Sequence, residues 1–350
     1  MTDWSVNLAN SKDEKAIVTF LQKNEMDGPI KLGLERTPDF FKSLDIEGHE
    51  KQVIVIKNND IHGLAICSWK KSYPENIVYL HSLKLSSSIR GSRALFLGFK
   101  KLKSLIKDNS IIYTTILSNN KTAIKVLTSK RVGLPNYIYQ GEILSYMFKS
   151  LSESKSLQTN IRSIKSSDIN NLITFWKDQA KNRSLMPEVN ESHFLTYSGP
   201  LLGYQMKNIL IAEKNGVIIA SLAFRNVFNW KAWVVKGYSK SISILKPFIN
   251  IYSALRGIPN LPNKGPITNT YMGAWYLSAE GLTPARHLLE KAREMIGEKS
   301  QLLLALHEDD PLNECCHQVP KRILKSKLYT IRWDDSSEKL QNPYLDTGTL

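Results

Sequence analysis

A short basic loop between a strand and a helix carries the clearest chemical signal in this sequence. Residues 83–95 read LKLSSSIRGSRAL, which predicts a strand end, a polar turn and the first turn of a helix. Such a junction directs unpaired backbone N–H groups and the positive end of the helix dipole at one point. Gly91 lets a phosphate approach the backbone closely, and Arg90 and Arg93 add positive charge. The loop therefore favours a pyrophosphate ligand.

A histidine in the preceding strand could exchange a proton near neutral pH. His81 lies in the segment YLHSLKL, residues 79–85, and an imidazole titrates close to physiological pH. Alternation along a strand puts His81, Leu83 and Leu85 on one face, which predicts a position in the core. A β-bulge would reverse that alternation. A core role and a catalytic role therefore both stay open for His81.

A second polar group follows a very apolar strand in the last third of the chain. His307, Glu308, Asp309 and Asp310 precede Pro311, and open α/β sheets place their sites at the ends of strands. Asp310 before Pro311 is a ready helix start. A substrate-binding or base role stays open for His307 and Glu308.

The elements that would position these residues occur twice along the chain. Residues 13–21 (DEKAIVTFL) and 168–176 (DINNLITFW) each predict an amphipathic helix opened by an Asp cap. In each half two apolar strands then surround a polar turn and predict a hairpin, at 53–66 and 209–224. A strand, a helix and a strand follow, at 77–85, about 93–107 and 111–117 in the first half and at 271–277, about 285–298 and 301–306 in the second. Two tandem α/β units explain this order.

The repeat sets the expected domain boundaries. A first domain at 1–149 and a second at 161–334 are separated by the serine-rich segment 150–160, which suits an exposed linker, and 335–350 form a tail. The second half also carries an insertion at 230–266, with a helix predicted near 242–255. Such an insertion is typical of a lid or substrate loop, or of a disordered segment.

The order of elements and the basic loop together resemble the GNAT superfamily of acyl-CoA-dependent N-acyltransferases. The family pattern at this loop is L-x-V-x-P-x-x-R-G-x-G-x-G/A, and the matching residues are Leu83, Leu85, Arg90 and Gly91. Three positions depart from it, where Pro, Gly and a small residue are replaced by Ser87, Arg93 and Leu95. The resemblance implies two GNAT-like folds, each a mixed, mainly antiparallel sheet flanked by helices.

The resemblance also implies that acetyl-CoA or another acyl-CoA binds at this loop. The implied binding residues are Leu83, Lys84, Leu85, Arg90, Gly91, Ser92, Arg93, Ala94, Leu95 and Asn120. Asn120 matches the Asn of the family's Asn-x-x-Ala, which meets the pantetheine arm, and a helix N-cap explains it equally well. The second half offers Glu280 and Gly281 in place of Arg-Gly, so we expect it to bind no cofactor.

The implied reaction is direct attack of an amine on the thioester. It needs a base for the ammonium proton and a donor for the developing oxyanion. His81 and Glu35 are the candidate bases. The tyrosine that protonates the leaving thiolate in the family is replaced by Leu127, so either Tyr137 or Tyr139 supplies that proton or CoA leaves as the thiolate.

Three further residues are candidates for contact with the acceptor. Asp39, like Glu35, lies where substrate loops of the family are found, although the segment also fits a surface turn. His307 and Glu308 are the candidates from the second half. The acceptor is expected to be a small-molecule or peptide amine.

Composition narrows the remaining classes of function. The net charge of +15 favours an anionic partner: a nucleic acid, a membrane surface or a phosphate-bearing cofactor. Cys67, Cys315 and Cys316 have no metal-ligand spacing, so neither structural zinc nor a disulfide framework is expected. No apolar run reaches the ~18 residues of a membrane span, and the expectation is a cytoplasmic enzyme without a metal.

Two alternatives belong to other functional classes. A Fem-type transferase also has tandem GNAT-like folds and uses aminoacyl-tRNA, which the positive charge suits, so nucleic acid remains a less favoured partner. A non-catalytic GNAT-like binding protein is the other alternative, consistent with the eroded loop pattern and the missing tyrosine. A cleft blocked at the thioester position would favour the latter.

We predict that Gly91→Val weakens CoA binding more than Arg90→Ala does. A side chain at position 91 obstructs the approach of the phosphates to the backbone, whereas Arg90→Ala removes a charge-assisted contact of about 1.5–3 kcal/mol. Dissociation constants for CoA, measured beside melting temperatures, test the comparison. Unchanged affinity in Gly91→Val would place the phosphates elsewhere, and equal melting losses in both variants would make the loop structural.

Overall fold

The computed structural model describes residues 4–24, 28–72, 75–106, 110–152, 161–277 and 282–349. Most of the expected linker and the expected second loop with Glu280 and Gly281 lie outside these residues. None of the helices in the described part of the chain has the length and apolar character needed to traverse a bilayer.

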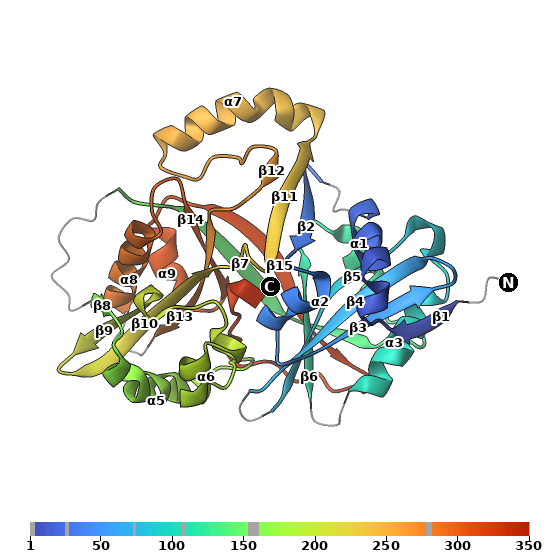
Figure 1. The fold of residues 1–350 in the computed structure, drawn as a ribbon, viewed down its shortest axis with the longest axis horizontal. Coiled ribbons are helices and arrows are strands. Elements are labelled where there is room, and N and C mark those ends of the chain that lie inside the picture. Colours follow the sequence, from blue (N-terminus) through green and yellow to red (C-terminus); the bar gives the residue numbers. More distant parts are fainter. Residues whose placement is uncertain are drawn as a thin grey trace.

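The two halves share a common order of elements, to which the first half adds β2 and the second half adds β11, α7 and β12 (Figure 1). The first half consists of β1 (Ser5–Leu8), α1 (Glu14–Lys23), β2 (Ile30–Arg36), α2 (Phe40–Ser43), β3 (Glu50–Lys57), β4 (Ile61–Lys70), β5 (Ile77–Leu85), α3 (Ala94–Leu105), β6 (Ile111–Leu117), α4 (Lys121–Leu127) and β7 (Asn136–Lys149). The second consists of β8 (Ile161–Ser163), α5 (Ile169–Ala180), α6 (Glu191–Thr196), β9 (Ile209–Lys214), β10 (Val217–Asn226), β11 (Lys231–Tyr238), α7 (Lys240–Leu255), β12 (Gly265–Pro266), β13 (Thr270–Leu277), α8 (Leu282–Met295), β14 (Gln301–His307), α9 (Asn313–His317) and β15 (Arg322–Arg332).

Alternation along the strands builds the two cores in the same way. In β3, Val53 and Val55 pack under α1 and α2, whereas Ile54 packs on the opposite face under α3. In β9, Ile209 packs under α5 and Leu210 under α8. Each half is therefore a sheet covered on both faces, and the predicted helices and hairpins occur where the apolar periodicity placed them.

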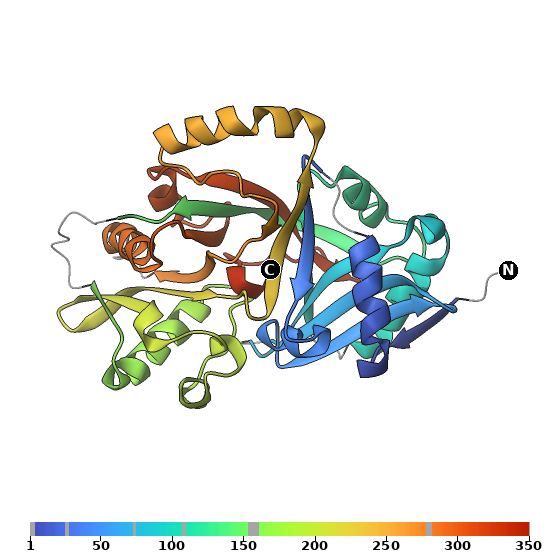
Figure 2. The ribbon, with the colours of Figure 1, turned by 45° about the horizontal axis from the view of Figure 1, so that its top comes forward.

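The halves share one sheet because they exchange their last strands. The sheet has twelve strands in the order β1-β3-β4-β5-β6-β15-β7-β14-β13-β10-β9-β8. Strand β15 of the second half lies between β6 and β7, and β7 pairs in turn with β14 of the second half. The sequence predicted two sheets, and the exchange fuses them into the continuous sheet seen in Figure 2.

The insertion of the second half is ordered by the first half. Strand β11 pairs along its length with β2 and on its other side with β12, which makes a separate three-stranded sheet. Helix α7 follows β11 and stands apart from the remaining helices at the top of the molecule (Figures 1 and 2). The predicted helix near 242–255 is thus confirmed, and the segment is folded.

We predict that Gly141→Ala destabilises the strand exchange. Gly141 has φ +113° beside a bulge in β7, and a Cβ there would overlap the ring of His307. Backbone strain and overpacking together should lower the free energy of unfolding by about 2–5 kcal/mol. Gly216→Ala is the control, since Gly216 also has a positive φ (+77°) but open space around it. Equal losses in denaturant titrations of both variants would contradict the prediction.

Candidate active site

Strand β5 carries a β-bulge at Ser82, the residue after the candidate histidine. Ser82 has φ +53°, and the pairing of β5 with β4 shifts register at this point. The extra residue reverses the alternation of the strand. Leu83 therefore packs with Leu80 under α3, whereas His81 stacks on Tyr79 on the opposite face, with ring centroids 4.9 Å apart. His81 is thus not part of the core beneath α3.

The parallel strands β5 and β6 separate next to this bulge. They pair only through Ile77–Tyr79 and Ile111–Tyr113, and beyond Tyr79 strand β5 pairs with β4 alone. An unpaired strand edge presents N–H and C=O groups that an extended ligand can use. At the start of the gap the Tyr79 hydroxyl lies 3.1 Å from Thr115 Oγ1 of β6.

His81 points into a buried polar cluster on this side of the sheet. Its Nε2 atom lies 3.1 Å from Ser68 Oγ and 3.2 Å from Glu47 Oε2, and its Nδ1 atom lies 3.2 Å from Ser82 Oγ. The His81 and Glu47 side chains are only 8% and 2% exposed. Glu47 Oε2 nevertheless receives no hydrogen bond from the described residues, so it is an acceptor available to a protonated imidazole.

Glu47 joins both halves of the chain. Its Oε1 atom lies 3.0 Å from Arg36 Nη2 at the end of β2 and 3.6 Å from Lys231 Nζ at the start of β11. These two strands are paired, with Arg36 directly opposite Lys231. Two buried cations and one buried carboxylate are therefore held together by the three-stranded sheet.

Burial and charge set the protonation of this pair at neutral pH. Burial lowers the pKa of His81 to about 3, although Glu47 opposes the shift. For Glu47, burial favours the protonated acid, but Arg36, His81 and Lys231 outweigh that effect and lower its pKa to about 2. The result is a neutral imidazole beside a charged carboxylate. A neutral imidazole is the form that a general base needs, and a charged carboxylate is the group that would stabilise an imidazolium.

The end of the chain lies against the same cluster. Lys70 Nζ donates hydrogen bonds to Thr349 Oγ1 (2.8 Å) and to the Tyr113 hydroxyl (3.3 Å), and it lies 5.6 Å from the centroid of the Tyr79 ring. Burial lowers the pKa of Lys70 to about 8. Residues of the expected tail are thus part of the site.

The basic loop is exposed at the N-terminus of α3. Gly91 has φ +82° with open space where a side chain would point, so Gly91→Val carries backbone strain in addition to any obstruction. Arg90 and Arg93 are exposed, and Arg90 Nε donates to Leu85 O at 3.2 Å. The Ser92 hydroxyl accepts a hydrogen bond from Ala94 N.

The strand residues assigned to the cofactor lie on both sides of β5. Leu83, Leu85 and Leu95 line an apolar cavity between the sheet and α3, whereas Lys84 donates to Asn24 O at 2.7 Å. Asn120 caps α4, its Oδ1 atom accepting from Ala123 N at 3.2 Å, and its amide N–H groups have no hydrogen-bond partner among the described residues.

Tyr137 lies under α3 rather than beside His81. Its ring contacts those of Phe99 and Tyr329, and its hydroxyl is buried without a hydrogen-bond partner among the described residues. Burial raises its pKa, which keeps the phenol protonated. Tyr139 is partly exposed under Lys327.

The two acidic candidates before the first hairpin have other partners. Glu35 forms an exposed ion pair with Lys236 at 2.8 Å. Asp39 caps α2, its Oδ1 atom accepting from Lys42 N at 2.7 Å. The described contacts place neither carboxylate against His81.

The candidates of the second half lie where strands β14 and β7 pair. His307 Nε2 lies 2.7 Å from Gln140 O, and Glu308 Oε1 accepts from Glu142 N at 2.9 Å. Both side chains satisfy backbone groups of the bulged β7 strand, which accounts for them structurally.

The gap of the second half is filled by the tail. Strands β13 and β14 pair as far as Gly273 and Leu304, the counterpart of the gap between β5 and β6. There Thr347 Oγ1 accepts from Ala305 N and donates to Gly273 O, both at 2.8 Å. The buried Arg225–Asp346 ion pair, at 2.8 Å, holds the same segment.

Comparison with solved structures identifies the fold. The glucosamine N-acetyltransferase region of a fungal multi-domain β-N-acetylglucosaminidase has a TM-score of 0.62 at 13% identity over 94% of this chain, which spans 38% of that protein. A GCN5-related N-acetyltransferase from Sphaerobacter thermophilus has a TM-score of 0.56 at 12% identity, covering 99% of this chain and 98% of its own. This chain has the GNAT fold.

A second kind of acyltransferase shares the GNAT fold with this chain. Saccharomyces cerevisiae N-myristoyltransferase with bound myristoyl-CoA has a TM-score of 0.55 at 10% identity, covering 96% of this chain and 84% of its own. Neither a protein-family model nor a curated protein matches the sequence. Among the described residues, no group of His, Cys, Asp and Glu is arranged to hold a metal ion.

Sequence reasoning missed most partners of His81 within this GNAT fold. Glu47, Arg36 and Lys231 are separated by up to 195 positions in the numbering, from 36 to 231, and no local pattern connects them. One signal was available: Lys70 and Arg225 stand at or near the ends of otherwise apolar strands. A charge in such a position indicates a buried partner.

We predict that His81→Gln reduces the loss of stability on acidification. Because the pKa of His81 is lowered from 6.5 in the folded chain, unfolding takes up a proton at this ring below that pH. The free energy of unfolding should fall toward pH 4 by up to about 1.4 kcal/mol per pH unit for this group. Denaturant titrations across this pH range should show that the free energy of unfolding falls less steeply in His81→Gln than in the wild type.

His62→Gln is the matched control for this experiment. His62 is half-buried on the neighbouring strand β4, outside the Glu47 cluster, and its replacement should leave the wild-type pH dependence in place. The proposed neutral imidazole would be contradicted if the free energy of unfolding of His81→Gln fell with pH as steeply as that of the wild type. It would also be contradicted if both variants showed the same reduction in this pH dependence.

Proposed function

We propose that this chain is an acyl-CoA-dependent N-acyltransferase with one cofactor site, in the first half. The observation that carries the proposal is the His81–Glu47 pair, at 3.2 Å, on the bulged strand where β5 separates from β6. A neutral base with a carboxylate behind it, next to an unpaired strand edge, suits proton removal from a bound amine.

The residues next to the separation of β5 and β6 suit an acyl-CoA ligand. The exposed backbone around Gly91, the N-terminus of the twelve-residue helix α3 and the exposed Arg90 and Arg93 suit a pyrophosphate. The free edge of β5 and the amide of Asn120 suit the pantetheine arm. Acyl-CoA supplies the activated thioester that an amine can attack.

The protein's own contribution is positioning and proton transfer. His81 takes the proton from the acceptor's ammonium group at Nδ1, the ring nitrogen that does not face Glu47, and the Glu47 carboxylate at Nε2 stabilises the imidazolium that results. Ser68 and Ser82 hold the ring from its two nitrogen atoms. Arg36 and Lys231 keep Glu47 charged, so its carboxylate is available to His81 in each catalytic cycle.

A single site follows from the difference between the two gaps. Thr347 occupies the gap between β13 and β14, bonded to both strands, whereas the gap between β5 and β6 has the Tyr79–Thr115 contact at its start. A ligand in the second gap would have to displace a buried segment of the chain.

Binding without catalysis is the second candidate function. An acceptor amine must reach the His81 ring for catalysis, but His81 is only 9% exposed. This burial favours a protein that binds without catalysing. The two candidates differ in whether CoA thiol is released from acyl-CoA in the presence of an amine.

Calorimetry and kinetics together test the proposal. We expect one CoA per chain in a titration, and a thermal-shift series from acetyl-CoA to myristoyl-CoA should identify the preferred acyl group by the largest rise in Tm. With a panel of primary amines, His81→Ala should lower kcat/KM for thiol release about 100- to 10,000-fold while the Kd for CoA is unchanged.

His193→Ala is the control variant, because His193 Nδ1 only accepts a hydrogen bond from Asn190 N, the N-cap of α6 in the second half. It should retain both activity and affinity. A stoichiometry of two CoA molecules per chain would contradict the single site. Thiol release at the wild-type rate in His81→Ala would show that His81 is not the base. CoA binding with no release under any amine would favour the non-catalytic candidate.

A further inference from the structure

Helix α7 is held to the protein by polar side chains and turns its most apolar side toward solvent. Ser253 is buried, Asn250 Oδ1 accepts from Leu261 N, and Lys246 Nζ donates to Pro262 O and to Asn263 Oδ1. A helix that packs on a globular core normally does the opposite.

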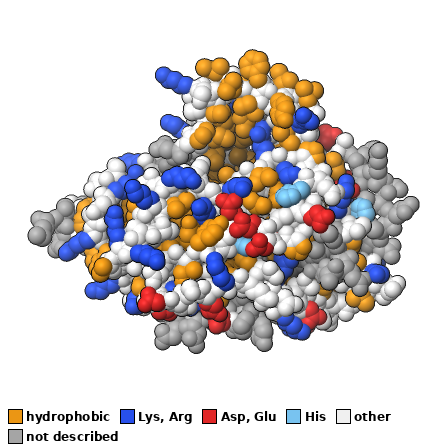
Figure 3. Space-filling model, turned by 180° about the vertical axis from the view of Figure 1, so that it is seen from behind, with side chains coloured by type: hydrophobic (Ala, Val, Ile, Leu, Met, Phe, Trp, Pro, Cys, Tyr) orange, Lys and Arg blue, Asp and Glu red, His pale blue; other side chains and the backbone are white. Residues whose placement is uncertain are grey.

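The apolar side of α7 is a continuous exposed stripe. Successive residues of a helix are about 100° apart, which places the stripe half a turn from the residues that hold α7 to the protein. The stripe consists of Ile244 (71% exposed), Leu245 (49%), Phe248 (68%), Ile251 (61%), Tyr252 (55%) and Leu255 (82%). Seen from behind, these side chains gather over the top of the molecule (Figure 3). No other helix in the described part of the chain has a comparable row among its exposed large hydrophobic residues.

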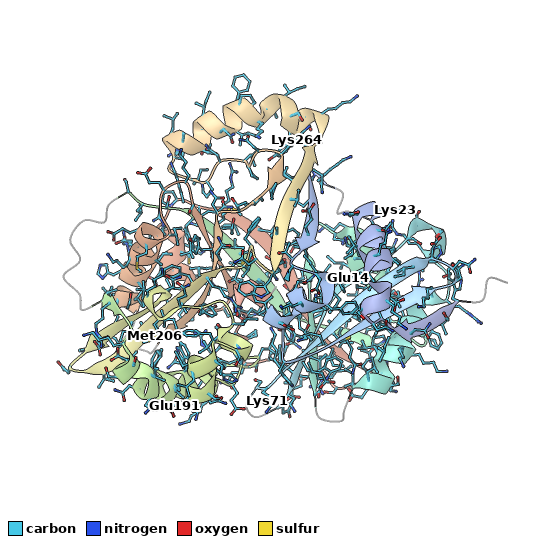
Figure 4. All side chains as sticks on the ribbon, in the orientation of Figure 1. Glu14, Lys23, Lys71, Glu191, Met206 and Lys264 are labelled. Atoms are coloured by element: carbon cyan, nitrogen blue, oxygen red, sulfur yellow. The ribbon has the colours of Figure 1, made fainter. Side chains whose placement is uncertain are left out.

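The inserted segment that carries this stripe is basic. The segment 230–266 contains no Asp or Glu, and its basic residues are Lys231, Lys236, Lys240, Lys246, Arg256 and Lys264. Of these, Lys236, Lys240, Arg256 and Lys264 are exposed, and Lys236 forms an ion pair with Glu35 of the first half. Figure 4 shows Lys264 on the loop beneath the helix. An apolar stripe beside basic side chains is the pattern of a helix that lies in the surface of an anionic bilayer.

We propose that the apolar stripe of α7 docks on anionic lipid and holds the protein at a membrane surface. The charges select this occupant over a second copy of the chain, because two copies meeting at this stripe would bring together the exposed Lys240, Arg256 and Lys264 of both copies without an acid of their own segment. The whole chain carries +15, which adds to the attraction.

The docking helix is connected to the site by one strand. Strand β11 enters α7 through Tyr238 and Ser239, and its first residue, Lys231, contacts Glu47. Lipid contact at α7 therefore orients the opening of the gap relative to the bilayer. The proposal does not depend on the proposed acyltransferase activity.

Co-sedimentation with lipid vesicles tests the docking surface. We expect the full chain to bind vesicles containing phosphatidylglycerol at least about tenfold more tightly than vesicles of phosphatidylcholine alone, and to dissociate at high salt. Phe248→Glu should lower the affinity for anionic vesicles by at least about tenfold. Lys240→Glu should lower it by about fivefold or more, since each basic residue contributes about that factor.

Leu195→Glu is the matched control, because Leu195 is 77% exposed but lies on α6. It should bind anionic vesicles as the wild type does. Unchanged melting temperature and unchanged CoA affinity in Phe248→Glu separate this proposal from the function of the gap.

Three results would overturn the proposal. Equal affinity for neutral and anionic vesicles would show that charge does not select the lipid. An equal loss of vesicle affinity in Leu195→Glu and Phe248→Glu would show that the stripe is not the docking surface. A dimer seen by light scattering that Phe248→Glu dissociates, without any vesicle binding by the wild type, would assign the stripe to a second copy.

Discussion

The buried carboxylate of Glu47 is the interaction on which the arrangement of the site depends. Three groups from three strands meet it: Arg36 from β2, His81 from β5 and Lys231 from β11. Leaving any one buried charge without its partner costs about 3–5 kcal/mol. This requirement holds the inserted sheet against the first half, and it also fixes the ring and the protonation of His81.

Exchange of the last strands has the corresponding role at the level of the fold. Because β15 lies between β6 and β7, neither half can bury its sheet edge without the other. The chain that leaves β15 then runs between the halves, where Asp346 pairs with Arg225 and Thr347 bridges β13 and β14. One gap is thereby filled by the protein itself, and the other is left beside the His81 cluster.

The same architecture explains why an insertion could acquire a surface of its own. Strand β11 is anchored at one end by the buried Lys231 and along its length by β2. Helix α7 at its other end is held through Ser253, which accepts a hydrogen bond from Arg322 Nη2 at 2.6 Å, and through Lys246. The residues of its apolar stripe are exposed and can face a partner.

The sequence by itself determined the local elements and the repeat. Apolar periodicity predicted helices at 13–21 and 168–176, hairpins at 53–66 and 209–224, and the helix of the insertion, because burial of one face is a local property. The Arg90–Gly91 loop was likewise visible in the sequence, and its position before α3 agrees with the strand-loop-helix pattern. Its role in binding CoA stays a prediction.

Only the tertiary structure decided which residues meet. The bulge at Ser82 turns His81 away from the core under α3, and alternation alone could not reveal it because one extra residue reverses every later side chain. Glu47 and Lys231 are brought together by pairing of β2 with β11, a long-range contact without a local signature. The filling of the second gap by Thr347 depends on strand exchange in the same way. Propensity and pattern act over a few residues, whereas these contacts depend on how whole strands pair.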